Sequence, residues 1–243
     1  MSNDVKASVR ETFHRQAPGT MTEIAKLTRM RFNQPRMGQA FALAAICAAL
    51  VLPAAVPARA DIVGDWSSVT APAPPELKPV TLDDATTALL VLDFLPPNCG
   101  ISPACQAVMP RVRPLLDAAR AAHVLVIYTT FPGFTAAQTL APVAPLGGEP
   151  SVATIADKFI NTNLDAILKG KGIKTVVVTG VVANGAWLLT SADAAMRGYK
   201  VVALIDATWA PTPYEQQLAA AELVSAPTVS QNVTLSRTTM VKF

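Results

Sequence analysis

The chain is poor in the residues that most often build metal and nucleophilic sites. It has two histidines and three cysteines among 243 residues. His14 lies in the basic amino end, so His123 is the one histidine in the rest of the chain, at the start of a predicted strand. Zinc sites need three or four Cys, His or carboxylate ligands. We therefore expect no metal and no cofactor.

Charge is also scarce, because Asp, Glu, Lys and Arg make up 15% of the sequence. Residues 1–60 carry 8 basic and 3 acidic side chains, whereas residues 61–243 carry 12 basic and 14 acidic ones. The formal net charge of +3 therefore belongs to the amino end. Nucleic-acid-binding domains present a basic face, and residues 61–243 offer none, so we expect no nucleic-acid partner.

No hydrophobic run is long enough for a comfortable membrane span, which takes about 20 residues. The run Ala40–Leu52 has 13 residues, follows three arginines within positions 29–36, and precedes the small-residue triplet Ala58-Arg59-Ala60. This order is typical of a secretory signal peptide. We predict that residues 1–60 are an extension and signal peptide cleaved before Asp61. The mature protein would be periplasmic or secreted, without membrane contact; an uncleaved amino-terminal anchor is the alternative.

Export bears on the two cysteines that remain, Cys99 and Cys105, in the segment NCGISPAC. A nearby pair in an oxidising compartment favours a loop-closing disulfide over a metal site. The alternative is that Cys99 or Cys105 is a catalytic nucleophile.

From position 85 onward, strand and helix patterns alternate without an internal repeat. Apolar runs predict strands at Thr86–Asp93, His123–Thr129, Lys174–Thr179, Lys200–Ile205 and Asn232–Ser236, and 3.6-residue periodicity predicts helices at 104–122, Ile160–Lys169, Ala186–Arg197 and Tyr214–Val224. Pro110 and Pro114 should kink the first helix or delay its start. Such alternation indicates an α/β domain with a mainly parallel sheet. Residues 61–84, rich in proline and alanine, are predicted to form an extended arm, and residues 85–243 the domain.

Ligands of open parallel sheets bind at the carboxyl ends of the strands. Asp93, the long loop Phe131–Pro150 and the turn Gly180–Ala186 are predicted to meet there. A partly desolvated carboxylate such as Asp93 can shuttle protons, although it could equally cap a helix or brace a loop. The turn places small residues at a helix start, where free N–H groups can bind an anion or an oxyanion; alternatively, small residues only permit close packing. Asp206 is interpreted as structural.

The sequence resembles the isochorismatase-like (cysteine hydrolase) superfamily over roughly Ala85–Val229. Four segments carry the resemblance: ALLVLDF at 88–94, KFINTNLDAILKGKGIKTVVVTG at 158–180, GVVANGAW at 180–187 and TSADAAMRGYKVVALIDA at 190–207. Their order and spacing are specific together, whereas each alone is weak. The resemblance implies a Rossmann-like three-layer α/β/α sandwich.

The family's usual apparatus is an Asp, a Lys and a Cys. Asp93 matches the Asp, which acts as general acid or base, while the Cys position falls on Ala186. The Lys position falls near Ala153 or Thr154, and the nearest basic residue is Lys158, which either takes over that role or pairs with Asp157 or Asp93. Without a thiol at position 186, the resemblance implies no thioester chemistry there.

The resemblance also implies two functions. Isochorismatases resemble this chain in having a small residue where the Cys would be, because protonation of a vinyl ether needs an acid and not a thiol. We therefore expect an exported hydrolase acting on a vinyl ether, an amide or a similar bond of a small molecule. The alternative is a catalytically inactive protein of the same fold that binds a small molecule.

Substrate contacts are predicted from the turn and from nearby aromatic residues. The expected set is Val182, Ala183, Asn184, Gly185, Phe131 and Trp187. Phe134 and Trp209 could also line an apolar pocket, although core or subunit packing is the alternative for each ring. The high apolar fraction, 51%, is consistent with a buried subunit interface. Because members of the family it resembles commonly form oligomers, we also expect a homo-oligomer.

Overall fold

The computed structural model describes residues 61–243, so the predicted signal peptide lies outside the described residues. Its strands are β1 Val80–Thr81, β2 Thr87–Leu92, β3 Leu125–Thr130, β4 Ser151–Ala153, β5 Thr175–Val181, β6 Lys200–Trp209, β7 Val233–Ser236 and β8 Val241–Lys242. Its α-helices are α1 Pro103–Gln106, α2 Met109–Ala121, α3 Leu164–Gly170, α4 Leu188–Met196 and α5 Pro213–Ser225. None of the helices within residues 61–243 is long and apolar enough to cross a membrane.

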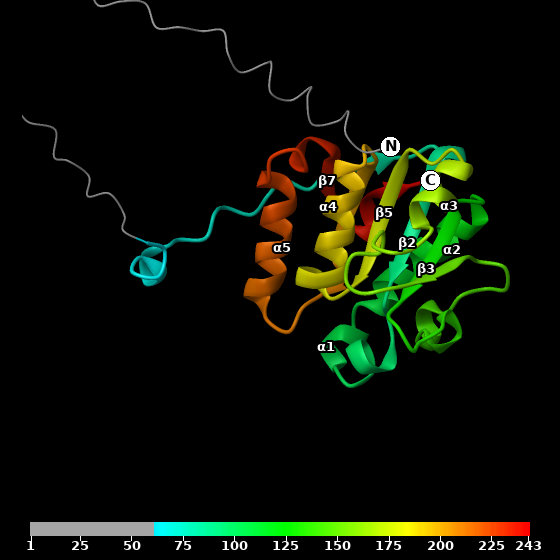
Figure 1. Ribbon diagram of the computed structural model, residues 1–243, viewed down its shortest axis with the longest axis horizontal. Coiled ribbons are helices and arrows are strands. Elements are labelled where there is room, and N and C mark those ends of the chain that lie inside the picture. The colour runs from blue at the N-terminus through cyan, green and yellow to red at the C-terminus, as the bar shows by residue number, and fades with distance from the viewer. Residues whose placement is uncertain (1–60) are drawn as a thin grey trace, which may run out of the picture. The chain divides into compact units, whose positions relative to one another are not determined.

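Six parallel strands form the central sheet in the order β4-β3-β2-β5-β6-β7 (Figure 1). The chain builds outward from β2 to β4 and then restarts at β5 on the other side of β2. The strand order therefore reverses between β2 and β5, where Leu92 pairs with Gly180. Loops leave this point in opposite directions, which is where open α/β sheets bind ligands.

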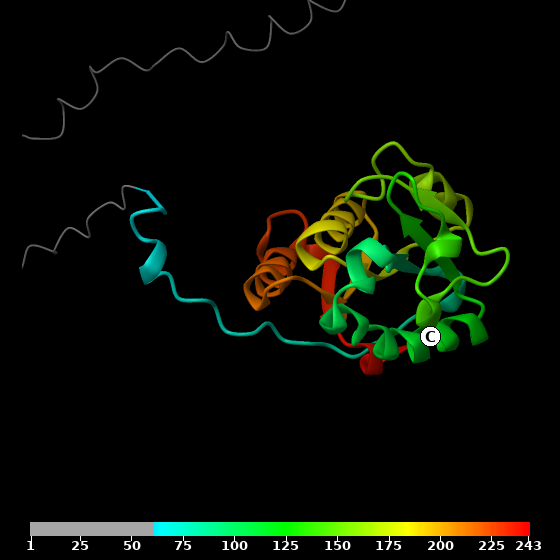
Figure 2. The ribbon, with the colours of Figure 1, turned by 90° about the horizontal axis from the view of Figure 1, so that it is seen from below.

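Helices cover both faces of the sheet, as Figure 2 shows for α2 and α4 on opposite sides. One core packs α3, α4 and α5 against alternate residues of the strands, including Leu90 and Val178. The other packs α1 and α2 against the intervening residues, including Leu89 and Val177. Because β2 is buried at every position, its near-continuous apolar sequence is the one expected of a strand covered on two faces. The predicted three-layer α/β/α fold is confirmed.

The arm that precedes the sheet is anchored at its carboxyl end. Lys78 N donates to the Leu235 carbonyl at 3.0 Å, and Ser236 Oγ donates to the Lys78 carbonyl at 2.7 Å. Strand β1 then pairs in parallel with β8, which forms a separate two-stranded sheet. The arm is thus tied to the end of the chain by the β7 edge and by β8.

Several predicted boundaries differ from the structure. The helix expected over 104–122 is divided into α1 and α2, because each has a proline in its first turn, where the missing N–H is tolerated; Pro114 nevertheless lies inside α2. The helix expected from Ile160 begins only at Leu164, because Asn161 has a φ of +55°. The edge strand β4 was not predicted, since its three residues sit next to a Pro- and Gly-rich loop.

Candidate functional site

A buried ion pair lies where the strand order reverses. The ammonium Nζ of Lys158 is 2.7 Å from Oδ2 of Asp93, and the two side chains are 0% and 6% exposed. Asp93 directly follows β2 and has a φ of +52°, so the chain turns sharply away from the sheet there. Both side chains are shielded from bulk water. Attraction between charges is stronger in such a buried environment than at the protein surface.

The other carboxylate oxygen of Asp93 is also occupied. Thr129, near the end of the neighbouring strand β3, donates its hydroxyl to Oδ1 of Asp93 at 2.8 Å. Burial raises the pKa of Asp93 above its usual range, and this effect outweighs the lowering by Lys158 and by Thr129. Asp93 therefore holds its proton to a higher pH than an exposed aspartate, as a general acid requires.

Lys158 reaches Asp93 from a loop that follows β4. Its Nζ also donates to the carbonyls of Thr154, at 3.2 Å, and Thr130, at 3.3 Å. The lysine comes four residues after Thr154, yet its ammonium lies against the Thr154 backbone, beside the position where the family resemblance places its Lys. Of the two partners that the sequence left open, Asp93 is the one in contact.

The loop carrying Lys158 is fixed to α4. The backbone N of Lys158 donates to Oγ1 of Thr190 at 3.1 Å, and that hydroxyl donates to the Ala156 carbonyl at 3.4 Å. Ala186 precedes Thr190 by four residues, about one helical turn, and is buried. The position of the family Cys therefore lies one turn from the residue that holds the Lys158 loop.

Gly180 allows the end of β5 to approach β2 beside Asp93. Its φ is +114°, and a Cβ at this position would collide with the backbone of Leu92. Beyond it, Val182 opens the turn Ala183–Trp187. The N–H groups of Gly185 and Trp187 both donate to the Val182 carbonyl, at 3.0 and 3.3 Å. These two groups are thus used within the turn and do not face a ligand.

The remaining predicted substrate contacts divide into two groups. Phe131 follows Thr130, whose carbonyl binds Lys158, and its half-buried ring packs on Phe134 with centroids 4.5 Å apart. Asn184 instead donates to Glu215 of α5 at 3.2 Å. The Trp187 indole is fully buried and donates to the Val178 carbonyl at 3.2 Å, within β5. Phe131 therefore adjoins the ion pair through its chain neighbour Thr130, whereas Asn184 and Trp187 form their side-chain hydrogen bonds with Glu215 and Val178.

A disulfide closes the loop that follows Asp93. Cys99 and Cys105 are bonded, with Cα atoms 5.1 Å apart, and both are fully buried. The predicted disulfide is thus present, and neither cysteine carries a thiol. In the same loop, Asn98 donates its side-chain amide to the Asp93 carbonyl at 3.2 Å. Within residues 61–243 no three His, Cys, Asp or Glu side chains gather in a way that could hold a metal ion.

Sequence reasoning missed the threonines that organise the site. Thr129 and Thr190 contact the ion pair and its loop through their hydroxyls, and Thr130 and Thr154 through their carbonyls. A usable signal existed for Thr129, since it ends the strand predicted next to the one that precedes Asp93. Another existed for Thr190, at helical spacing from Ala186.

Comparison with known proteins agrees with this geometry. Residues 87–234 match the isochorismatase domain family. No functionally curated protein matches the chain at a significant level. Among solved structures, a cysteine hydrolase from Pseudomonas syringae pv. phaseolicola 1448A is 22% identical, with a TM-score of 0.58, over 68% of this chain and 94% of that one.

Two further structures have the same fold. An isochorismatase-like hydrolase from Alkaliphilus metalliredigens is 24% identical, with a TM-score of 0.57, over 63% of this chain and 95% of that one. N-carbamoylsarcosine amidase from Thermoplasma acidophilum is 22% identical, with a TM-score of 0.54, over 63% and 96%. At these identities the structures establish the shared fold, while the family match spans more than half of the chain. The chain therefore belongs to the isochorismatase family of hydrolases.

Proposed function

We propose that this protein is an exported hydrolase that cleaves a vinyl ether bond of a small molecule by acid catalysis, without a cysteine nucleophile or a metal. The observation that carries the proposal is the buried contact of 2.7 Å between Asp93 and Lys158 at the reversal of strand order. A carboxyl group whose pKa is raised by burial is available as a proton donor.

The chemistry needs one proton and one water. Asp93 would protonate the outer carbon of the carbon–carbon double bond, and the ether oxygen would stabilise the resulting oxocarbenium ion. Water would then add to the cationic carbon and lose a proton, which restores the acid form of Asp93. The hemiketal so formed breaks down to a carbonyl compound and an alcohol. Lys158 stabilises the carboxylate formed by the first step, and Thr129 holds its second oxygen.

Amide cleavage suits this site less well, because it ordinarily proceeds through a nucleophile. The family Cys position falls on Ala186, and both cysteines within residues 61–243 are in the disulfide. The disulfide also supports export, since such bonds persist in oxidising compartments. Because Asp93 and Lys158 are buried, we propose that substrate enters by displacing the loop that carries Phe131 and Phe134.

The test compares the unchanged protein with Asp93→Asn on a panel of vinyl ethers, amides and imides. General acid catalysis contributes about 10²- to 10⁴-fold, so Asp93→Asn should lose that much turnover, while Asp117→Asn, on the exposed side of α2, should lose none. Equal turnover by Asp93→Asn would reject Asp93 as the acid. Ligand binding without turnover of any compound would instead favour the binding-protein alternative. Mass spectrometry of the exported protein tests the proposed export, since cleavage of the signal peptide should leave Asp61 at the amino terminus.

A further inference from the structure

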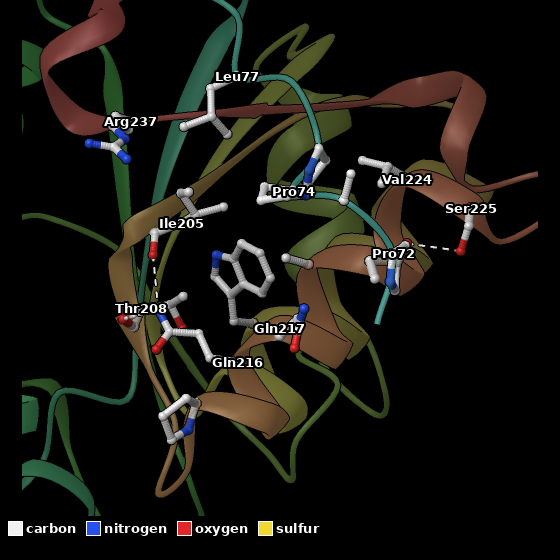
Figure 3. Close-up of a pocket in the computed structure, with 16 residues that line it drawn as sticks. Pro72, Pro74, Leu77, Ile205, Thr208, Gln216, Gln217, Val224, Ser225 and Arg237 are labelled. Carbon is white, nitrogen blue, oxygen red and sulfur yellow. Dashed lines mark hydrogen bonds between the residues drawn. The ribbon is translucent and has the colours of Figure 1, made fainter. Parts of the chain in front are cut away.

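A groove that is lined in part by Trp187 has features of a binding site separate from Asp93 and Lys158. Its volume is about 570 Å³, within the range of small-molecule pockets. Figure 3 shows Ile205 and Thr208 of β6 along one wall, Val224 and Ser225 of α5 along the opposite side, and the arm above them. Neither Asp93 nor Lys158 lines the groove, so the inference stands apart from the proposed hydrolysis.

Most of the groove surface is apolar. Trp187 forms part of its lining with an indole that is fixed by the hydrogen bond to Val178. Leu77 and three prolines of the arm, Pro72, Pro74 and Pro75, line it as well. A ligand that fills this space must therefore present an apolar body, because no hydrogen-bonding group of these five residues' side chains remains free.

Two polar groups of the lining have no partner in the part of the chain that the structure describes. Thr208 is 3% exposed, and its hydroxyl has no hydrogen-bond partner within the described residues. Arg237, at the same edge as Ile205, makes no side-chain hydrogen bond or ion pair within residues 61–243. Buried polar groups in native proteins are almost always hydrogen-bonded, so the Thr208 hydroxyl, which is buried beneath the groove surface, departs from that rule.

Asp206 does not form an ion pair with Arg237. Both oxygens of Asp206 accept from Thr238, from its backbone N–H and from its hydroxyl, each at 2.9 Å. The wall itself is held in place by Gln216, whose side-chain amide donates to the carbonyls of Ile205 and Thr208 at 3.1 and 3.4 Å. The exposed guanidinium thus lies at the edge of a fixed apolar groove without an ion pair within residues 61–243.

From this arrangement we propose that the groove binds a small amphipathic carboxylate, such as a medium-chain fatty acid. The alkyl chain lies in the groove beneath the arm, and the carboxylate pairs with Arg237 at the edge of the groove. A guanidinium is well suited to a carboxylate, because its donors match the two oxygens. Arg237 also borders a second hollow on the α2 side, which contains Arg111, so the test must separate the two.

The test is calorimetric titration with decanoate and with decanol, its uncharged counterpart, on proteins that are all expressed from the full chain and so are processed alike. The unchanged protein should bind decanoate at least tenfold more tightly than decanol. Arg237→Gln should remove that preference without changing the affinity for decanol. Arg111→Gln, the matched control in the second hollow, should bind decanoate unchanged. Ala221→Phe, which fills the groove from α5, should weaken both ligands at least tenfold.

Three results would overturn the inference. The first is no decanoate binding up to about 1 mM, the affinity of a weak fragment. The second is equal decanoate affinity in Arg237→Gln and the unchanged protein. The third is a loss caused by Arg111→Gln, which would place the ligand in the other hollow.

Discussion

The ion pair and the groove differ in how their polar atoms are satisfied, although the same helical start touches both. Thr190 fixes the loop of Lys158, and Trp187 lines the groove. In the first region, both carboxylate oxygens of Asp93 accept hydrogen bonds, and the ammonium of Lys158 has three oxygen neighbours. In the second, a buried hydroxyl and an exposed guanidinium have no partner among residues 61–243.

The difference separates two kinds of site. A fully connected polar cluster is rigid and holds its groups in one geometry, whereas a partly satisfied one is costly unless something else completes it. A search for hollows alone would find the groove and overlook Asp93 and Lys158, because these two side chains are buried against one another. On the two proposals made above, the cluster serves chemistry and the groove serves binding.

Breaking the buried pair should have the largest effect on stability. Lys158→Met leaves the Asp93 carboxylate without its charged partner, and such loss typically costs 3–5 kcal/mol, about a third of the stability of an ordinary domain. The matched control is Lys169→Met, because Lys169 meets Asp165 at the same 2.7 Å but with side chains 66% and 25% exposed. Exposed helical pairs contribute only about 0.3–0.5 kcal/mol. Urea unfolding of both variants measures the contrast, and equal losses would show that burial does not distinguish the pairs.

Removing the disulfide should have the next largest effect. The bond spans six positions of sequence, and closing so short a loop stabilises the fold by roughly 2–3 kcal/mol in the chain-entropy account. The double variant Cys99→Ala, Cys105→Ala should therefore unfold at lower urea, and substrate turnover should fall as the Asp93 loop loosens. The groove contains no covalent link, so its decanoate affinity should stay unchanged. A variant with unaltered unfolding would show that the loop is held by its other contacts.

The pH dependence of turnover tests the state of Asp93. An acid catalyst works when protonated, so the rate should be highest below the pKa of Asp93 and fall about tenfold per pH unit above it. Burial raises this pKa, and the Thr129 hydrogen bond lowers it. Removing that bond in Thr129→Val should therefore move the falling limb to higher pH. A rate that rises with pH instead would mean that Asp93 acts as a base.

The sequence predicted the parts of this fold that depend on local pattern. β2 and β5 were found because a strand covered on two faces must be apolar throughout. The Cys99–Cys105 bond followed from spacing and the expected compartment. The sequence does not predict β4, because a strand of three residues that pairs with one neighbour is too short to show a periodic pattern. The start of α3 was placed too early, since the apolar pattern extends into a loop that Asn161 turns with a positive φ.

The candidate site was less predictable, because it joins segments distant in sequence. Asp93 and the turn at Gly180 follow from strand ends alone. The partner of Lys158 stayed open between Asp157 and Asp93, because the choice depends on how the loop after β4 folds back across the sheet. The sequence predicts that the Trp187 indole contacts substrate, yet a side chain at the start of a helix can turn either toward the site or back toward the preceding strand. Here the indole donates to the Val178 carbonyl of β5.

The finest comparison replaces one threonine hydroxyl in each region by a methyl group. Thr129→Val removes the donor to Oδ1 of Asp93, and loss of a hydrogen bond to a charged group costs about 1.5 kcal/mol. Thr208→Val removes a buried hydroxyl that has no partner within the described residues, so stability should change by no more than about 0.5 kcal/mol, or even increase. The free energies of unfolding from urea titrations decide the matter. If Thr208→Val costs as much as Thr129→Val, the Thr208 hydroxyl has a hydrogen-bond partner in solution, and the contrast between the two regions fails.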